Sequence, residues 1–156
     1  MKYEEFLRVA ALLNGELGVA PLLYGSLGLE RRLREDLGAD DIDVLLPERF
    51  LRADWPRLVA LMERAGYTLY DPDEHAFLHG GTSVAFASLE NLRPFAGVDP
   101  EAIPLVEDGG ARYLLLELGD YLKVYEASSL DGYRKNVKHK EDQAKIARIR
   151  AALSAR

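Results

Sequence analysis

Apolar and polar positions along the chain change their period several times, and these changes predict alternating helices and strands. Apolar residues spaced three or four apart predict amphipathic helices over residues 2–14, 27–37 and 55–65. Short apolar runs predict buried strands over 21–24 and 41–46. Because strands and helices alternate in this half of the chain, we expect α/β architecture with the helices packed on a sheet.

The second half of the chain predicts a hairpin, a loop-rich stretch and a mainly helical C-terminal part. In order, the pattern predicts a strand at 67–70, a hairpin of 75–78 and 82–87, loops over 88–110, a strand and helix from 112, and a last helix over 131–153. A hairpin beside alternating strands and helices makes the expected sheet mixed. We therefore expect one α/β (α+β) domain over residues 1–156, with 1–110 as its core and 111–156 as a helical appendage.

Composition narrows the possible functions. The chain has 156 residues, 48% of them hydrophobic, and no cysteine. A protein without cysteine has no disulfides, no thiolate metal site and no cysteine nucleophile. The first helix carries acids in its first turns, so it does not resemble a signal peptide, and no apolar run is long enough to span a membrane. We expect a cytoplasmic protein with no membrane partner.

Charge is distributed unevenly. Residues 1–132 carry 12 Lys/Arg against 24 Asp/Glu, and residues 133–156 carry 8 against 2, which gives balances of −12 and +6. A basic final helix suits a site in which its cations contact an anionic ligand. Equally, these charges could complement the acidic body or serve a protein partner. An acidic body of this size makes general nucleic-acid binding an unfavoured function.

The segment 22–46 carries the residues with the clearest chemistry. An apolar strand leads into Gly25 and Ser26, which open a helix, and the next strand begins with Asp41 and Asp43. Glycine permits a tight turn, and the free N–H groups of a helix N-terminus attract phosphate. Two carboxylates two residues apart on a strand leave the same face and can bind a divalent cation such as Mg²⁺. The alternative is a turn glycine, a capping serine and two solvated acids.

This ordered pattern resembles the signature of the DNA polymerase β-like nucleotidyltransferase superfamily. Tyr24, Gly25 and Ser26 match its first part, and Asp41 and Asp43, after 14 intervening residues, match its Asp-x-Asp strand. The resemblance implies a small bacterial nucleotidyltransferase-like protein with a palm-like core. It also implies Mg²⁺ held by Asp41 and Asp43, and transfer of a nucleoside monophosphate from a nucleoside triphosphate to a small-molecule or protein hydroxyl.

The sequence departs from this signature at the third acid that active members usually place on a later strand. The expected strand at 82–87 carries Ala85 in the matching phase. Glu90, Glu74 or His75 could reach the site instead, although no spacing requires any of them. The alternative function is therefore a non-catalytic module that binds a nucleotide or another phosphorylated ligand, and whether the protein is an enzyme stays open.

The final helix supplies the basic candidates. Lys138 and Lys140 are expected to contact phosphates, with Asp142 orienting the first of them across one helical turn. The alternative is an ordinary surface ion pair between Lys138 and Asp142. Arg31 and Arg32 are lesser candidates for phosphate contacts. His75 and His79 lack an evident third metal ligand, so we interpret them as packing or solvent-facing residues.

Overall fold

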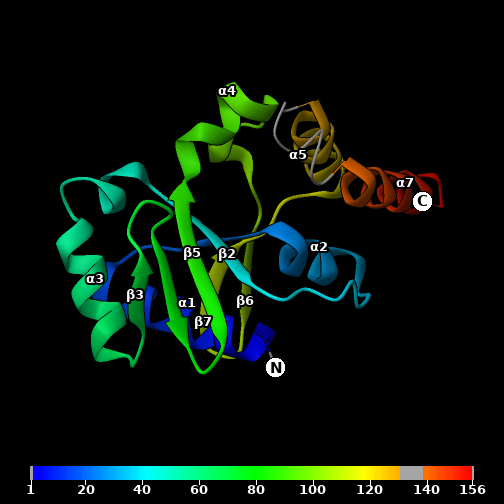
Figure 1. Ribbon diagram of the computed structural model, residues 1–156. Coiled ribbons are helices and arrows are strands. Elements are labelled where there is room, and N and C mark those ends of the chain that lie inside the picture. Colours follow the sequence, from blue (N-terminus) through cyan, green and yellow to red (C-terminus); the bar gives the residue numbers. More distant parts are fainter. Residues whose placement is uncertain (1, 131–138, 156) are drawn as a thin grey trace.

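The computed structural model describes residues 2–130 and 139–155, which form a mixed sheet with helices around it (Figure 1). The sheet has seven strands in the order β3-β4-β5-β2-β1-β7-β6. The strands are β1 (Leu22–Tyr24), β2 (Ile42–Leu46), β3 (Thr68–Asp71), β4 (Ala76–His79), β5 (Thr82–Ser88), β6 (Leu105–Asp108) and β7 (Ala111–Leu114). The mixed α/β fold expected from the sequence is confirmed.

The helices surround the sheet and extend beyond one end of it. They are α1 (Lys2–Leu17), α2 (Gly25–Leu33), α3 (Trp55–Arg64), α4 (Leu92–Ala96), α5 (Leu118–Leu130) and α7 (His139–Ser154), with short 3-10 helices η1 (Glu48–Leu51), η2 (Leu89–Asn91) and η3 (Pro100–Ala102). Within the described residues, no helix combines the length and the apolar character needed to cross a membrane.

Two differences from the sequence expectation have an identifiable physical reason. The helix expected over 27–37 ends at Leu33, because Arg34 adopts the left-handed conformation that terminates a helix. The stretch 88–110, expected to be loops, contains α4 and the edge strand β6. β6 escapes detection because most of its residues are exposed, so it lacks an apolar run. Gly109 and Gly110 form the turn that joins it to β7.

The register of the central strands gives the sheet one buried face and one open face. β2 pairs antiparallel with β1 and parallel with β5. Along β5, Val84 and Phe86 are buried, whereas Ser83, Ala85 and Ala87 on the opposite face are partly or fully exposed. Residues that pair directly across strands share a face. The face of Ala85 therefore also carries its partner on β2, Asp43.

Helix α1 crosses the buried face and ties its two halves together. In its first turn, Lys2 Nζ donates to Thr82 Oγ1 of β5 at 3.0 Å. Further along, the Phe6 ring packs edge-on against Tyr113 of β7, with ring centroids 5.1 Å apart. Both rings are fully buried, as is Leu13 in the last part of the helix. The apolar stripe predicted for this helix thus forms the central part of the core.

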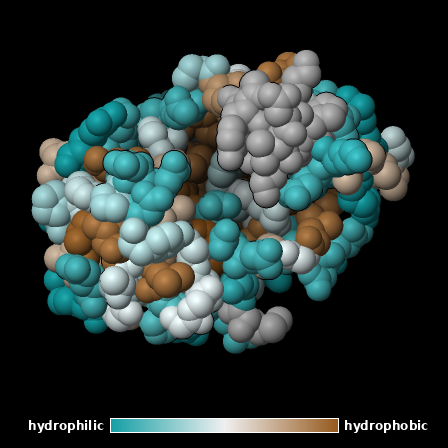
Figure 2. Space-filling view, viewed as in Figure 1, coloured by the Kyte–Doolittle hydropathy of each residue, from teal (hydrophilic) through white to brown (hydrophobic). Residues whose placement is uncertain are grey.

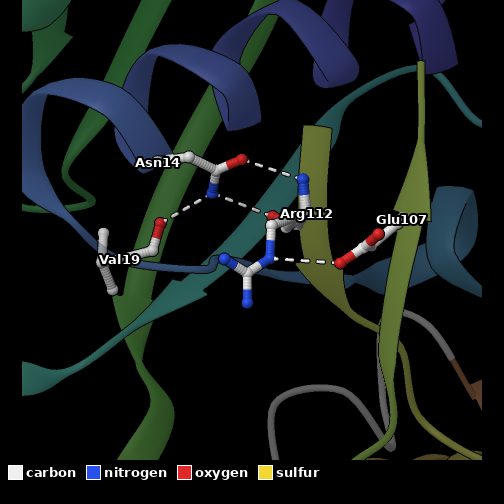
Figure 3. Close-up of polar contacts among 4 residues, drawn as sticks. All are labelled: Asn14, Val19, Glu107 and Arg112. Carbon is white, nitrogen blue, oxygen red and sulfur yellow. Dashed lines mark hydrogen bonds and ion pairs between the residues drawn. The ribbon is translucent and has the colours of Figure 1, made fainter. Parts of the chain in front are cut away.

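The end of α1 is fixed to β7 by the side chain of Asn14 (Figure 3). Asn14 Nδ2 donates to Arg112 O at 3.0 Å, and Arg112 N donates to Asn14 Oδ1 at 2.8 Å. Nδ2 also donates to Val19 O at 2.9 Å. The amide thus pairs with β7 as a neighbouring strand would and holds the connection that leads into β1.

Asn14→Ala should lower the free energy of unfolding by about 1–2 kcal/mol, because three backbone groups lose their partner and exchange it for water. Urea unfolding followed by circular dichroism measures the loss. Asn91→Ala is the matched control, since Asn91 is exposed and makes no side-chain cap bond; its change should stay within about 0.5 kcal/mol. Equal losses in the two variants would contradict this role of Asn14.

Candidate functional site

A cavity of about 810 Å³ opens between the sheet and the helices α4, α5 and α7. In the view of Figure 2, the surface is hollowed in this region, with hydrophobic atoms in its depth and hydrophilic atoms along its left side. The sheet side contributes Gly25, Ser26, Asp40, Asp41, Asp43, Glu74 and Ala85, among others. The helical side contributes Leu92, Phe95, Val124, Tyr125, Ser128, Glu141 and Lys145. The structure thus brings Gly25, Ser26, Asp41 and Asp43 to one cavity.

The turn at Gly25 requires glycine for two reasons. Its φ of +65° is a left-handed conformation that side chains disfavour. A Cβ at this position would also overlap the Asp43 carboxylate and lie 3.2 Å from Asp43 Cβ and Cγ. Helix α2 begins at Gly25, and its N-cap residue Tyr24 makes no side-chain cap bond. The first amides of α2 and the Asp43 carboxylate therefore meet at one corner of the cavity.

Tyr121 of α5 supports this corner from below. Its hydroxyl donates to Leu23 O at 3.0 Å, and the side chain is fully buried. Burial raises the pKa of the Tyr121 hydroxyl well above its ordinary value, so the group remains a neutral donor. Gly28 leaves room for this contact, because a Cβ there would overlap both the Tyr121 hydroxyl and the Leu23 carbonyl oxygen. The strand before the turn and the helix after it are thereby held against α5.

The two aspartates of the Asp-x-Asp strand differ in exposure. Asp41 is exposed just before β2, whereas Asp43 is partly buried within it and pairs with Tyr24 of β1. Carboxylate oxygens are ligands that Mg²⁺ accepts, and substrate and water usually complete its coordination shell. The two carboxylates beside the Gly25 turn are therefore the residues that could hold Mg²⁺. Within residues 2–130 and 139–155, no three His, Asp or Glu side chains gather closely enough to hold a metal on their own.

Ala85 lies directly beside Asp43. The two residues are partners in the parallel pairing of β2 and β5. The position expected to lack an acid therefore does lie next to the Asp-x-Asp pair, and it contributes a methyl group to the cavity. The next strand brings Ala76 into register with Ala85. On the β5 side of Asp43, the residues in register are therefore both alanines, whereas on the β1 side Asp43 pairs with Tyr24.

The three residues proposed to replace this acid have separate positions. Glu90 accepts two hydrogen bonds from Glu48 N, at 3.0 and 3.1 Å, and caps η1 outside the cavity. The His75 ring packs edge-on against Trp55, with centroids 4.8 Å apart, so it belongs to the packing, as does His79 against Tyr67. Only Glu74 among the three lines the cavity.

The helical wall is held together by a fully buried carboxylate. Ser128 Oγ on α5 donates to Asp142 Oδ2 on α7 at 3.1 Å, and Asp142 has no exposed surface. Ile146 and Ile149 are buried on the same side of α7. Asp142 is therefore not a surface residue: its carboxylate joins α7 to α5 from within the core, whereas its expected pairing with Lys138 falls outside the described residues.

Among the described residues, the lysine at the cavity is not one of those expected. Lys138 lies outside the described residues, and Lys140 is exposed on α7 but does not line the cavity. Lys145 does line it, with its ammonium 5.4 Å from the centre of the Tyr125 ring. Positions 138, 141 and 145 are spaced three and four apart, so they lie on one face of a helix. This spacing could have identified Lys145 as a further candidate on the same face as Lys138.

Arg31 and Arg32 point away from the cavity. Arg31 stacks on the Tyr3 ring with its guanidinium 3.8 Å from the ring centre. Arg32 Nε donates to Leu116 O at 2.8 Å, and its Nη2 donates to Leu115 O at 3.1 Å. Both side chains thus contact elements next to α2, and neither lines the cavity.

Gly25→Ala should destabilise the protein more than Gly38→Ala, which serves as the control. Both glycines have positive φ, but a Cβ at Gly38 meets nothing within 4 Å. The left-handed backbone should cost about 1–2 kcal/mol at either site. Overlap with Asp43 should add about 1 kcal/mol or more at Gly25 only. Urea unfolding measures both losses, and equal losses would contradict the close contact between Gly25 and Asp43.

Both the fold and the sequence of this chain resemble those of known proteins. No family model matches the chain. It resembles the crystal structure of ANT(2")-Ia in complex with adenylyl-2"-tobramycin, with a TM-score of 0.50 and 16% identity over 97% of this chain and 99% of that one. A solution structure of the antibiotic-resistance factor ANT(2'')-Ia aligns with a TM-score of 0.49 and 18% identity over 99% of this chain and 94% of the other. The fold is nucleotidyltransferase-like.

A relative with closely similar sequence comes from Bacillus subtilis (strain 168). The uncharacterised protein YnaI is 46% identical over 144 residues, which cover 92% of this chain and 92% of YnaI. Identity at this level along nearly the whole length of both chains shows common family membership. The chain belongs to the same protein family as YnaI of Bacillus subtilis.

Proposed function

We propose that this protein binds a nucleoside triphosphate together with Mg²⁺ in the 810 Å³ cavity and transfers the nucleoside monophosphate to a hydroxyl group. The observation that carries this proposal is the contact between the Gly25 turn and Asp43 at the edge of that cavity. A turn of free amides binds phosphate, and an adjacent carboxylate pair binds the cation that accompanies it. The order of these parts follows the signature of the DNA polymerase β-like superfamily.

Each group would have a distinct role. Asp41 and Asp43 would hold Mg²⁺, which when bound supplies charge neutralisation for the polyphosphate. The α2 amides at Gly25 and Ser26 would bind phosphate oxygens and orient the reacting phosphorus. Lys145 would approach the phosphates from the helical wall, the role first assigned to Lys138 and Lys140. The nearby apolar residues Phe95 and Val124 would exclude water from one side of the ligand.

The acceptor is proposed to be a small molecule. ANT(2")-Ia, which has the same fold over nearly the same length, forms a complex with adenylyl-2"-tobramycin, a nucleotide-modified small molecule. The cavity of this chain is bordered on two sides, by the sheet and by α5 and α7, and its size suits a nucleotide beside a compact acceptor. A protein hydroxyl presented on a flexible segment is the other acceptor class.

A second candidate function is binding without turnover, and Ala85 favours it. The methyl group beside Asp43 supplies neither a metal ligand nor a base. In that case ATP would bind with Mg²⁺ but no pyrophosphate would be released. Pyrophosphate release from the unmodified protein would reject this second candidate.

Nucleotide with Mg²⁺ should raise the melting temperature. A ligand at 100 times its Kd stabilises by about 2.7 kcal/mol, which corresponds to roughly 5–10 °C for a domain of this size. ATP, GTP, CTP and UTP should each be tested by differential scanning fluorimetry. Asp43→Asn, Asp41→Asn or removal of Mg²⁺ with EDTA should abolish the shift. Asp73→Asn, an exposed acid that does not line the cavity, should retain it. Absence of a shift with all four nucleotides would reject the proposal.

Lys145→Met should weaken ATP binding about 10- to 100-fold, since a hydrogen bond to a charged group contributes roughly 1.5–3 kcal/mol. Isothermal titration calorimetry with ATP and Mg²⁺ gives the Kd. Lys140→Met is the matched control on the same helix, because Lys140 is exposed and away from the cavity lining. If Lys140→Met weakened binding more than Lys145→Met, the assignment of Lys145 would be wrong.

A further inference from the structure

The sheet surface next to Asp43 has an acid on its far side. Asp43, Ala85 and Ala76 are in register across β2, β5 and β4, and directly paired residues share a face. With strands about 4.8 Å apart, the Cα atoms of Asp43 and Ala76 are separated by about 10 Å. Ala85 leaves the space between them open to the cavity. A side chain from the turn before Ala76 can therefore extend toward Asp43 over the methyl group of Ala85.

Glu74 is the residue in that turn that lines the cavity. Its backbone is fixed on both sides. Glu74 N donates to Asp71 Oδ1 at 3.3 Å, and Phe86 N donates to His75 O at 3.1 Å, which extends the pairing of β4 with β5 up to the turn. His75 has a positive φ of 51° and packs against Trp55. Glu74 thus reaches the cavity from an anchored position beside β5.

The other described acids at the cavity have different positions. Asp41 and Asp43 belong to the proposed cation site. Asp40 also lines the cavity, directly before this pair and outside β2, on the same side of Ala85 as Asp43. Glu141 enters from α7 on the helical wall, which carries Lys145 as well. Glu74 is the described acid that lines the cavity from the β4 side of β5, whereas Asp43 lies on the β2 side of Ala85.

We propose that Glu74 accepts the proton of the acceptor hydroxyl, as a base displaced by one strand from the usual position. This inference rests on the proposed function. The hydroxyl O–H bond breaks and its proton moves to the Glu74 carboxylate. The oxygen then bonds to the α-phosphorus of the nucleotide, and the bond to the bridging oxygen breaks, so pyrophosphate leaves with its electron pair. Glu74 requires no role in binding the nucleotide, and this separates it from Asp41 and Asp43.

The test compares binding and turnover in the same variants, with ATP and Mg²⁺ and with either tobramycin or water as the acceptor. Glu74→Gln should lower the rate of pyrophosphate release about 10²- to 10⁴-fold, as expected for loss of a general base, and leave the ATP-induced rise in melting temperature unchanged. Asp73→Asn, the adjacent exposed acid, should change neither. Adding Ala85→Asp to the Glu74→Gln variant places a carboxylate beside Asp43. The double variant should release pyrophosphate at least tenfold faster than Glu74→Gln alone.

The outcomes separate this inference from the proposed function. No ATP-induced shift in the unmodified protein would reject the function itself. A shift without pyrophosphate release from either acceptor would overturn the role of Glu74 and leave a binding module. Turnover of Glu74→Gln within twofold of the unmodified rate would also overturn it. If Glu74→Gln lost both the ATP-induced shift and turnover, Glu74 would instead be assigned to ligand binding.

Discussion

The contact between the Gly25 turn and Asp43 is the constraint on which the site depends. β1 ends at Tyr24, which pairs with Asp43, and the chain then turns at Gly25 with no side chain between the turn and the carboxylate. Any larger residue would separate the helix amides from the acid. The close approach of the helix amides to an acid therefore needs three things at once: the β1–β2 register, a left-handed glycine and an acid at the paired position.

The helical wall is the second half of the cavity, and charged contacts set its position. Asp142 is buried against Ser128, and Arg150 contacts Glu126 at 2.9 Å, so α7 is fastened to α5 at two levels. Arg148 contacts Glu35, just beyond α2, which links α7 to the helix that begins at the Gly25 turn. Because the buried pair has little access to water, breaking it costs more than breaking the exposed pairs. The position of Lys145 follows from this arrangement.

The sequence was informative where one local rule determined the structure. Amphipathic periodicity identified α1 and α3, and the ordered glycine, serine and aspartates identified the sheet side of the cavity. It also identified Ala85 as the residue beside Asp43, since strand phase and pairing are linked. By contrast, β6 was missed because an exposed edge strand carries no apolar alternation.

The helical side of the cavity was less predictable, for a different physical reason. Which face of α7 meets the cavity depends on its packing against α5, a contact between helices that local periodicity does not encode. Asp142 looked like a surface residue by type and is fully buried, whereas Lys140 looked suited to a ligand and is exposed away from the cavity. Glu74 was one of three alternatives in the sequence, and it is the one of these three that lines the cavity. Tertiary contacts, not residue type, determine which of these side chains reach the cavity.

The charge around the cavity constrains any ligand that enters it. Asp40, Asp41, Asp43, Glu74 and Glu141 are acidic, and Lys145 is basic. At an effective dielectric constant near 20, each pair of like charges 4 Å apart costs about 4 kcal/mol. Under the proposed function, a free polyphosphate would therefore be repelled, and the cation and the nucleotide would have to bind as one unit. An acidic residue on the far side of Ala85 adds to this coupling, because it favours an acceptor that is neutral or positively charged over an anionic one. The same carboxylates that would hold the cation thus also limit which molecules can accompany it.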